Sequence, residues 1–150
     1  MEINSMFLKK FLIVTILIVS ALQIIPAQIL DLHIKNINPE KGQLCIAVFT
    51  DEAGFKAEKT YWETKCPKTL ILNGSFDLKI PLKPGKYGIS VLDDKNFNGK
   101  MEYNLFGIPR EGFGFSNYYQ HGIFRPTFGD FSFIIEKDET KPIIVRMKYF

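Results

Sequence analysis

Short runs of alternating apolar and polar residues fill most of this chain after position 27, and they constrain its fold more than any other feature. In the segment 29–37, apolar side chains take every second position from Leu30, and polar side chains such as His33 take the positions between them. A period of two is that of a strand with one buried face. His33 is therefore expected to point to solvent, as an ordinary polar residue of a half-buried strand.

The strongest local signal is the pair Asn73-Gly74, which separates the runs 69–72 and 75–82. Both residues tolerate the positive φ angles of a two-residue turn, so the pattern predicts a tight hairpin. The segment 50–65 has no sustained period and is expected to be a long connection with one helical turn at 57–62. Four further strands are expected at 43–49, 86–92, 131–136 and 143–149.

Together these runs give about seven strands, separated by turns except at two long connections. No helical period is sustained after position 27. The pattern predicts an all-β fold, an antiparallel β-sandwich of the immunoglobulin-like or transthyretin-like kind with one long Gly/aromatic loop. A single domain over 28–150 is large enough to bury a core between two sheets.

The first 27 residues have the composition of a secretory signal peptide. Lys9 and Lys10 precede an apolar run at 11–25, and Pro26-Ala27 ends it. A helix that spans a membrane needs about 20 apolar residues, and this run is shorter. The pattern predicts cleavage near Ala27, export to the periplasm or beyond, and no stable membrane span afterwards.

The charge balance gives no reason to expect a nucleic acid as partner. Without Glu2, Lys9 and Lys10 the formal net charge falls from +3 to +2. So small a surplus provides no basis for binding nucleic acid or an acidic membrane surface. A protein, a glycan or a small ligand remains as the class of partner.

Two cysteines, Cys45 and Cys66, lie in the part predicted to be exported. An oxidising compartment would allow a disulfide between them, and two free thiols are the alternative. The geometry of a disulfide is strict, and the sequence does not say whether the two Cβ atoms meet. A structural zinc site is not expected, because zinc needs four clustered ligands and only His33 and His121 could add to the cysteines.

The segment 93–130 differs in kind from the alternating runs, and its head fits the first half of a calcium loop, D-x-[DN]-x-[DN]-G. Four side chains and one main-chain carbonyl are expected to wrap a Ca²⁺ ion: Asp94, Asn96, Asn98, Lys100 (carbonyl) and Glu102. The twelfth position, where an EF-hand has a bidentate Glu, is Leu105, so such a site would be weak. The alternative is a solvated turn in which Asn98-Gly99 closes a hairpin without metal.

Ten of the chain's 21 aromatic residues lie between positions 103 and 133, interleaved with glycines. They could lock a long irregular loop onto the sandwich or form an exposed platform for a ligand, and the lock is favoured because large exposed aromatic patches are uncommon. Ser116 and His121 are the pair that could serve a hydrolase under the 106–128 loop. No G-x-S-x-G elbow accompanies them.

The order of these motifs resembles the DUF2141 family of exported bacterial proteins. Five segments carry the resemblance: G-Q-L-C-I-A-V-F at 42–49, G-F at 54–55, P-G-K-Y-G-I-S-V at 84–91, D-x-N-x-N-G-K-M-E at 94–102 and F-G-I-P-R-E-G-F-G-F-S-N at 106–117. The resemblance implies bacterial export and a β-sandwich, and it brings no established activity, substrate or catalytic residue. The cysteine pair is not part of the family pattern.

The sequence therefore predicts a non-enzymatic exported module that binds a partner or associates with the cell envelope. Its long loop would be braced by Ca²⁺ or by its own hydrogen bonds. The alternative is a small hydrolase with its site under the 106–128 loop. No recognisable arrangement of a nucleophile and a base supports that alternative.

Overall fold

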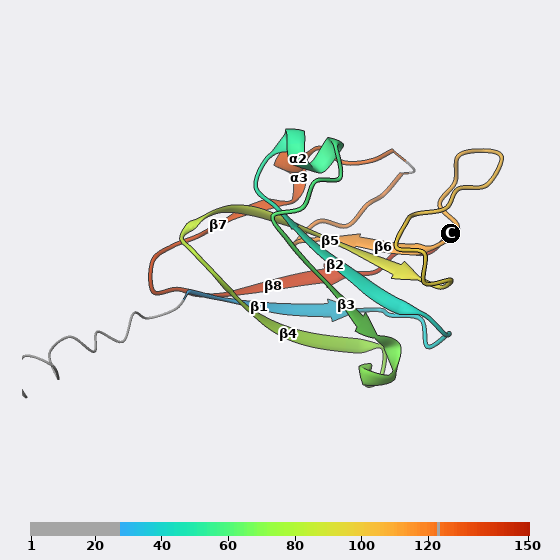
Figure 1. Cartoon of the computed structure of the whole chain (residues 1–150), viewed down its shortest axis with the longest axis horizontal. Helices are drawn as coiled ribbons and strands as arrows, with labels where there is room; N and C mark the ends of the chain where they lie inside the picture. Colours follow the sequence, from blue (N-terminus) through green and yellow to red (C-terminus); the bar gives the residue numbers. More distant parts are fainter. Residues whose placement is uncertain (1–27, 123) are drawn as a thin grey trace, which may run out of the picture.

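The computed structural model describes residues 28–122 and 124–150, and in that part of the chain two β-sheets pack face to face (Figure 1). The predicted all-β sandwich is therefore confirmed. The predicted signal peptide at 1–27 lies outside the described residues. No helix in the described part of the chain is long and apolar enough to cross a membrane.

The smaller sheet has the strand order β4-β1-β8. Its strands are β1 (Gln28–Lys35), β4 (Ser75–Leu82) and β8 (Thr140–Arg146). β1 pairs antiparallel with β4 but parallel with β8, from Ile29↔Thr140 to Lys35↔Arg146. The sandwich is thus not purely antiparallel, since its first and last strands run in the same direction. Alternation within a strand reports which face is buried and carries no information on the direction of a distant partner.

The larger sheet has the strand order β3-β2-β5-β6, and β7 also pairs with β5. Its strands are β2 (Gln43–Phe49), β3 (Trp62–Pro67), β5 (Gly85–Asp94), β6 (Gly112–Phe115) and β7 (Ser132–Ile135). β2 and β5 lie in the middle, which agrees with the apolar residues on both faces of β2.

The helical turn predicted at 57–62 is wrong in position. The helix α2 spans Glu52–Lys56, and Asp51 caps it by accepting a hydrogen bond from the Gly54 N–H at 2.7 Å. Asp is a strong N-cap because its carboxylate satisfies an N–H that the first helical turn leaves free. Trp62, assigned to the end of the predicted turn, begins β3 instead.

Of the hairpin predicted around Asn73-Gly74, the turn is confirmed and the first strand is wrong. The tight turn is present, with φ of 51° at Asn73 and 69° at Gly74, and a bridge between Leu72 and Ser75 closes it. The residues before the turn do not continue as a strand, because Lys68–Leu70 form a 3₁₀ turn, η1. β4 pairs with β1 instead, where Ile80 and Leu82 enter the core.

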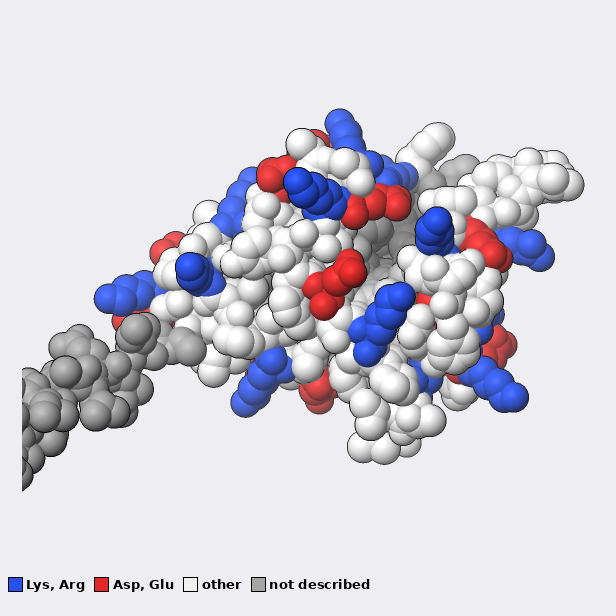
Figure 2. All heavy atoms as spheres, in the orientation of Figure 1, with Lys and Arg blue, Asp and Glu red and all other residues white. Residues whose placement is uncertain are grey.

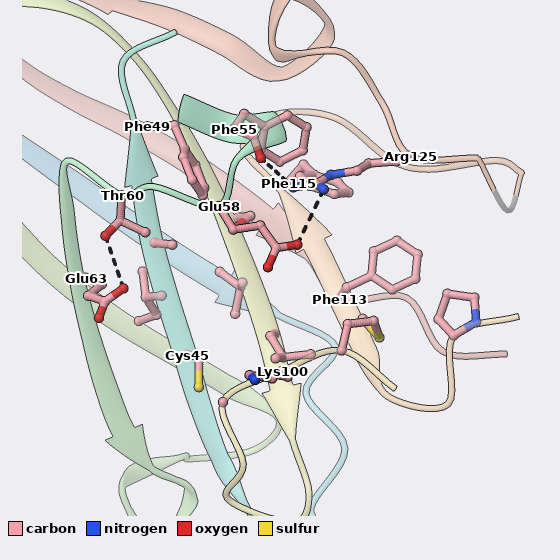
Figure 3. A pocket seen from close by; sticks show the side chains of 18 of the residues that line it. Cys45, Phe49, Phe55, Glu58, Thr60, Glu63, Lys100, Phe113, Phe115 and Arg125 are labelled. Carbon is pink, nitrogen blue, oxygen red and sulfur yellow. Dashed lines mark hydrogen bonds and ion pairs between the residues drawn. The ribbon is translucent and has the colours of Figure 1, made fainter. Parts of the chain in front are cut away.

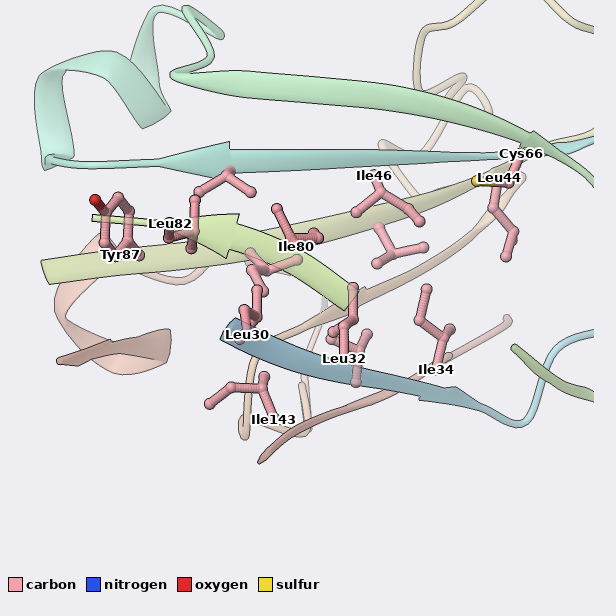
Figure 4. Close-up of a cluster of buried hydrophobic side chains, with 14 of the residues drawn as sticks. Leu30, Leu32, Ile34, Leu44, Ile46, Cys66, Ile80, Leu82, Tyr87 and Ile143 are labelled. Atoms are coloured by element: carbon pink, nitrogen blue, oxygen red, sulfur yellow. The ribbon is translucent and has the colours of Figure 1, made fainter. Parts of the chain in front are cut away.

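One apolar core fills the space between the two sheets (Figure 4). Alternate residues of the strands supply it, including Leu30, Leu32, Ile46, Ile89 and Ile143, all fully buried. A second, aromatic cluster lies on the opposite face of the larger sheet and contains Phe49, Phe55, Phe115, Phe128 and Phe131. The short helix α3 (Phe128–Phe131) supplies two members of this cluster. The larger sheet is therefore covered on both faces over part of its area.

The two sheets are joined along one side where β6 meets the C-terminal segment. Phe113 and Lys148 exchange two main-chain hydrogen bonds of 3.0 and 2.7 Å, and Ser116 forms a bridge with Val145. Met147 N–H also donates to the Lys35 carbonyl at 2.9 Å, so the C-terminal segment continues along β1. This side of the sandwich is closed by main-chain hydrogen bonds rather than by side chains alone.

Candidate functional site

The site begins at the end of β5, where the two consecutive residues Asp93 and Asp94 are both fully buried. Their side chains point to opposite faces of the sheet, as in any strand. Asp93 Oδ1 lies 2.6 Å from the Lys68 ammonium, and Asp93 Oδ2 accepts a hydrogen bond from the Tyr149 hydroxyl at 2.7 Å. Burial, together with the Asp93 carboxylate, raises the pKa of Tyr149 well above its usual value. Asp93 therefore anchors the fold and is not available to a ligand.

Asp94 fixes the first residue of the predicted calcium loop. Its carboxylate accepts hydrogen bonds from Gln43 Nε2 at 2.7 Å, the Gly99 N–H at 2.8 Å and the Asn98 N–H at 3.2 Å. Burial alone would raise the pKa of Asp94, but these hydrogen bonds outweigh it and hold the pKa below the usual value for an aspartate. The ionised form of Asp94 is the one that closes the loop.

The remaining side chains of the predicted loop meet around Glu102. Glu102 Oε1 accepts hydrogen bonds from Asn96 Nδ2 at 2.9 Å and Asn98 Nδ2 at 3.1 Å. Asn98 Oδ1 accepts from the Lys100 N–H at 2.7 Å, while the Lys100 side chain turns toward a neighbouring groove. The structure thus brings the side chains of Asn96, Asn98 and Glu102 together, whereas Asp94 contacts the loop through the main-chain N–H groups of Asn98 and Gly99.

These contacts brace the loop through its own hydrogen bonds. Among residues 28–122 and 124–150, no group of three or more His, Cys, Asp or Glu side chains could hold a metal ion. Asparagine amides and main-chain carbonyls, which are also calcium ligands, are outside that set. Calcium binding by Asp94, Asn96, Asn98, Lys100 and Glu102 stays a prediction.

Glu111 holds both ends of the same loop. Its side chain is buried, with one carboxylate oxygen accepting from the Lys95 N–H at 3.0 Å and the other from the Glu102 N–H at 3.3 Å. Burial is the main reason why the pKa of Glu111 is raised, and the nearby Asp94 and Glu102 carboxylates add to it. The two main-chain partners of Glu111 give its carboxylate a structural role.

The aromatic stretch divides into a buried part and an exposed part. Phe115, Phe128 and Phe131 belong to the second cluster, as the structural lock predicts. Phe106 and Phe124 are 83% and 82% exposed, as a binding platform would require. The lock thus describes the buried residues, and a binding platform at the exposed ones stays a prediction.

A groove of about 350 Å³ lies on the outer face of the larger sheet, between the end of α2 and the segment 94–102, here called the calcium-like loop. Figure 2 shows this face hollowed, with acidic and basic side chains around the hollow. The pairing register arranges its floor in two rows across β3, β2, β5 and β6. The first row is Glu63, Ala47, Ser90 and Phe115, and the second is Lys65, Cys45, Leu92 and Phe113. The middle of each row has a small side chain, and the β6 end has a phenylalanine.

The α2 end of the groove is closed by a set of paired groups. The Arg125 guanidinium donates to the Phe55 carbonyl at 2.7 Å, stacks over the Phe55 ring at 4.1 Å and lies 3.5 Å from a Glu58 carboxylate oxygen (Figure 3). These contacts tie the 124–126 segment to α2 and to the residues that follow it. Arg125 lines the groove, whereas Ser116 and His121, the pair of the hydrolase alternative, do not.

The two cysteines are free thiols on opposite faces of the larger sheet. Cys66 pairs with Leu44 and lies in the core, whereas Cys45 pairs with Lys65 and lines the groove. A disulfide between them would require one strand to turn over. Burial, followed by the nearby Asp94 carboxylate, raises the pKa of Cys45 to about 11, so its thiol is protonated at neutral pH.

Ser116 and His121 do not meet in a catalytic arrangement. The buried Ser116 hydroxyl accepts from the Ile89 N–H at 2.9 Å and donates to the Phe131 carbonyl at 2.6 Å. His121 is exposed and packs its ring against Tyr119, with 5.6 Å between the ring centroids. Neither residue is among those that line the groove. The Ser116 hydroxyl thus forms its hydrogen bonds with main-chain groups of β5 and α3.

Comparison with known proteins gives one match. The family model described as "Uncharacterized protein conserved in bacteria (DUF2141)" matches residues 32–143, which include the whole larger sheet, part of the smaller sheet, the calcium-like loop and the groove. Searches of the curated proteins and of the solved structures gave no significant match.

Proposed function

Because the chain belongs to the DUF2141 family of bacterial proteins, we propose that it is an exported, non-enzymatic β-sandwich that binds a small ligand in the groove. Export is supported by the signal-peptide pattern of residues 1–27. The periplasm or the extracellular medium is then the place where the ligand is met. The absence of an enzymatic role is supported by the Ser116 hydroxyl, whose hydrogen bonds go to the main chain.

One observation carries the proposal: the floor of the groove combines small and aromatic side chains in two ordered rows. Cys45, Ala47 and Ser90 leave space, and Phe113 and Phe115 offer apolar surface beside it. A volume of about 350 Å³ falls within the range of roughly 300–1,000 Å³ typical of small-ligand sites. An apolar floor with a few polar groups at its rim is also the usual composition of such sites.

The calcium-like loop has a supporting role in this proposal. Asn98 and Lys100 line the groove, and the hydrogen bonds of Asp94 and Glu102 hold the loop beside it. A weakly bound Ca²⁺ ion would add ligand bonds to the same residues. It would stiffen one wall of the groove and take no part in chemistry.

The test fills the groove from its centre. In Ala47→Phe, the new side chain occupies the space between Glu63 and Ser90, and ligand binding should weaken by at least about tenfold, or ~1.4 kcal/mol. The measurement is a thermal-shift screen of the purified protein against aliphatic and aromatic acids, sugars and short peptides, followed by titration of each ligand that raises the melting temperature.

Ala53→Phe is the matched control, because Ala53 is exposed on α2 and does not line the groove. Binding of the ligands found in the screen should be unchanged in this variant. Ligands that bind Ala47→Phe as tightly as the natural protein would show that the groove is not the binding site.

A further inference from the structure

The charged side chains of the groove are paired at one end and unpaired at the other. At the α2 end, Glu58 and Arg125 neutralise each other. At the opposite end, Lys65 and Lys100 both line the groove, and neither has a carboxylate within 4.0 Å among the described residues. Two ammonium groups without counterions on one wall of a hollow mark a place where a negative charge is favourable.

The two lysines converge although they come from different elements. Lys65 lies on the edge strand β3, directly opposite Cys45 on β2. Its ammonium nitrogen reaches the calcium-like loop, since a Cβ added to Gly99 would lie 3.1 Å from it. Lys100 is the next residue of that loop, and Figure 3 shows its side chain at the Cys45 end of the groove. Both charges therefore belong to the row that contains Cys45.

The same row ends in apolar surface. From Lys65 it crosses Cys45 and Leu92 to Phe113 on β6. Four neighbouring strands about 4.8 Å apart span about 14 Å, the length of an extended chain of roughly ten carbon atoms or of two fused rings with a substituent. The first row of the floor differs at its polar end, where it has the Glu63 carboxylate. Glu63 thus repels a negative group from the first row, and the lysines attract it to the second.

We infer that the groove takes an amphiphilic small-molecule anion, a carboxylate, sulfonate or phosphate monoester joined to an aliphatic or aromatic body. The acid group lies between the Lys65 and Lys100 ammonium groups, and the body covers Leu92 and Phe113. A simple inorganic anion would leave the apolar floor wet, and a neutral apolar molecule would leave both lysines without a counterion. This inference rests on the proposed function, because it names the ligand class of the same groove.

The experiment uses two fluorescent probes that differ in one charged group. 8-Anilinonaphthalene-1-sulfonate carries a sulfonate, and N-phenyl-1-naphthylamine has the same ring framework without it. The natural protein should bind the sulfonate at least about tenfold more tightly than the neutral probe, because the charge-assisted contacts to the lysines are made only by the sulfonate. Fluorescence titration at low and high salt measures both affinities, and added salt should weaken only the sulfonate.

The double variant Lys65→Met/Lys100→Met keeps most of the length of both side chains, since Met is one atom shorter than Lys, and removes both charges. Its affinity for the sulfonate should fall about tenfold or more, to that for the neutral probe, while the neutral probe changes less than about twofold. Lys79→Met is the control, because Lys79 is exposed on β4 in the other sheet. Unchanged sulfonate binding in the double variant would overturn the anion assignment.

The Ala47→Phe variant separates this inference from the function on which it rests. It should lose both probes, since it fills the space that the ring framework needs. If the natural protein binds neither probe, or if Ala47→Phe binds both normally, the groove itself is not a ligand site. If the groove variant loses both probes and the lysine variant loses none, the site stands and its ligand is not an anion.

Discussion

At the scale of single residues, the least replaceable charges are those that no ligand can reach. The Lys68 and Asp93 side chains are 6% and 0% exposed, and the Lys68 ammonium lies 2.6 Å from the Asp93 carboxylate. Removing one partner of such a pair leaves a buried charge without compensation, which costs far more than the pair itself contributes. The Tyr149 hydroxyl, which also accepts from the Asn38 N–H at 2.8 Å, joins the C-terminal segment to the same carboxylate.

Lys68→Met should therefore lower the free energy of unfolding by about 3–5 kcal/mol, because Asp93 would remain buried and unpaired. The double variant Lys68→Met/Asp93→Leu should recover most of that loss. Urea denaturation measures both values, and the exposed Lys79→Met should lie within about 0.5 kcal/mol of the natural protein. A double variant as unstable as the single one would contradict the account of a buried pair.

At the scale of elements, the loop 94–102 is held by hydrogen bonds that depend on the ionised form of Asp94. A carboxylate whose pKa is lowered by folding contributes stability above its unfolded pKa, near 3.8, and this stability is lost as the pH falls through the folded value.

The effect of pH on Glu111 is the opposite. Because its pKa is raised, the folded protein binds the Glu111 proton more tightly than the unfolded chain does, so ionisation of Glu111 lowers the stability as the pH rises past 4.5. As the pH falls, Glu111 therefore takes up its proton first, and the loop should loosen only at a lower pH, below 3.8, where Asp94 is protonated.

Calcium is best tested near neutral pH, where Asp94 is ionised. Millimolar Ca²⁺ should raise the melting temperature, because a ligand that binds only the folded state stabilises it, and Asp94→Ala should abolish the rise. Asp77→Ala, at an exposed position on β4, is the control and should keep the rise. A melting curve that saturating Ca²⁺ leaves unchanged would mean that the hydrogen bonds of the loop act without metal.

At the scale of the whole molecule, the closed side of the sandwich depends on the close approach of β6 to β8. A Cβ added to Gly114 would lie 2.6 Å from Val145 Cγ1 and 2.8 Å from the Arg146 carbonyl oxygen. The carbonyl belongs to the main chain of β8 and cannot move away without shifting the strand. The glycine is thus required at the point where the two sheets come together.

Gly114→Ala should destabilise the protein by about 1–3 kcal/mol, as an overpacked site does. Gly129→Ala, in α3, should have little effect, because the nearest atom to its added Cβ is 3.7 Å away. Thermal and urea unfolding of the two variants compare them directly. Equal stabilities would show that the sheets can separate at this point at little cost.

Local patterns in the sequence determined much of this protein. The period of two in β1 and β4 decides which side chains enter the core, because successive residues of a strand face opposite sides. Asn73-Gly74 decides the place of a tight turn, since both residues adopt positive φ. The oxygen-rich spacing of 94–102 also located the loop whose side chains meet around Glu102.

Tertiary structure alone decided how these pieces combine. The parallel pairing of β1 with β8 and the separation of Cys45 from Cys66 follow from registers between distant strands. The groove also depends on these registers, because each of its two rows combines side chains from four strands. None of these side chains is unusual within its own strand. Local alternation fixes the face of a side chain, whereas its neighbours depend on which strands pair and in which register.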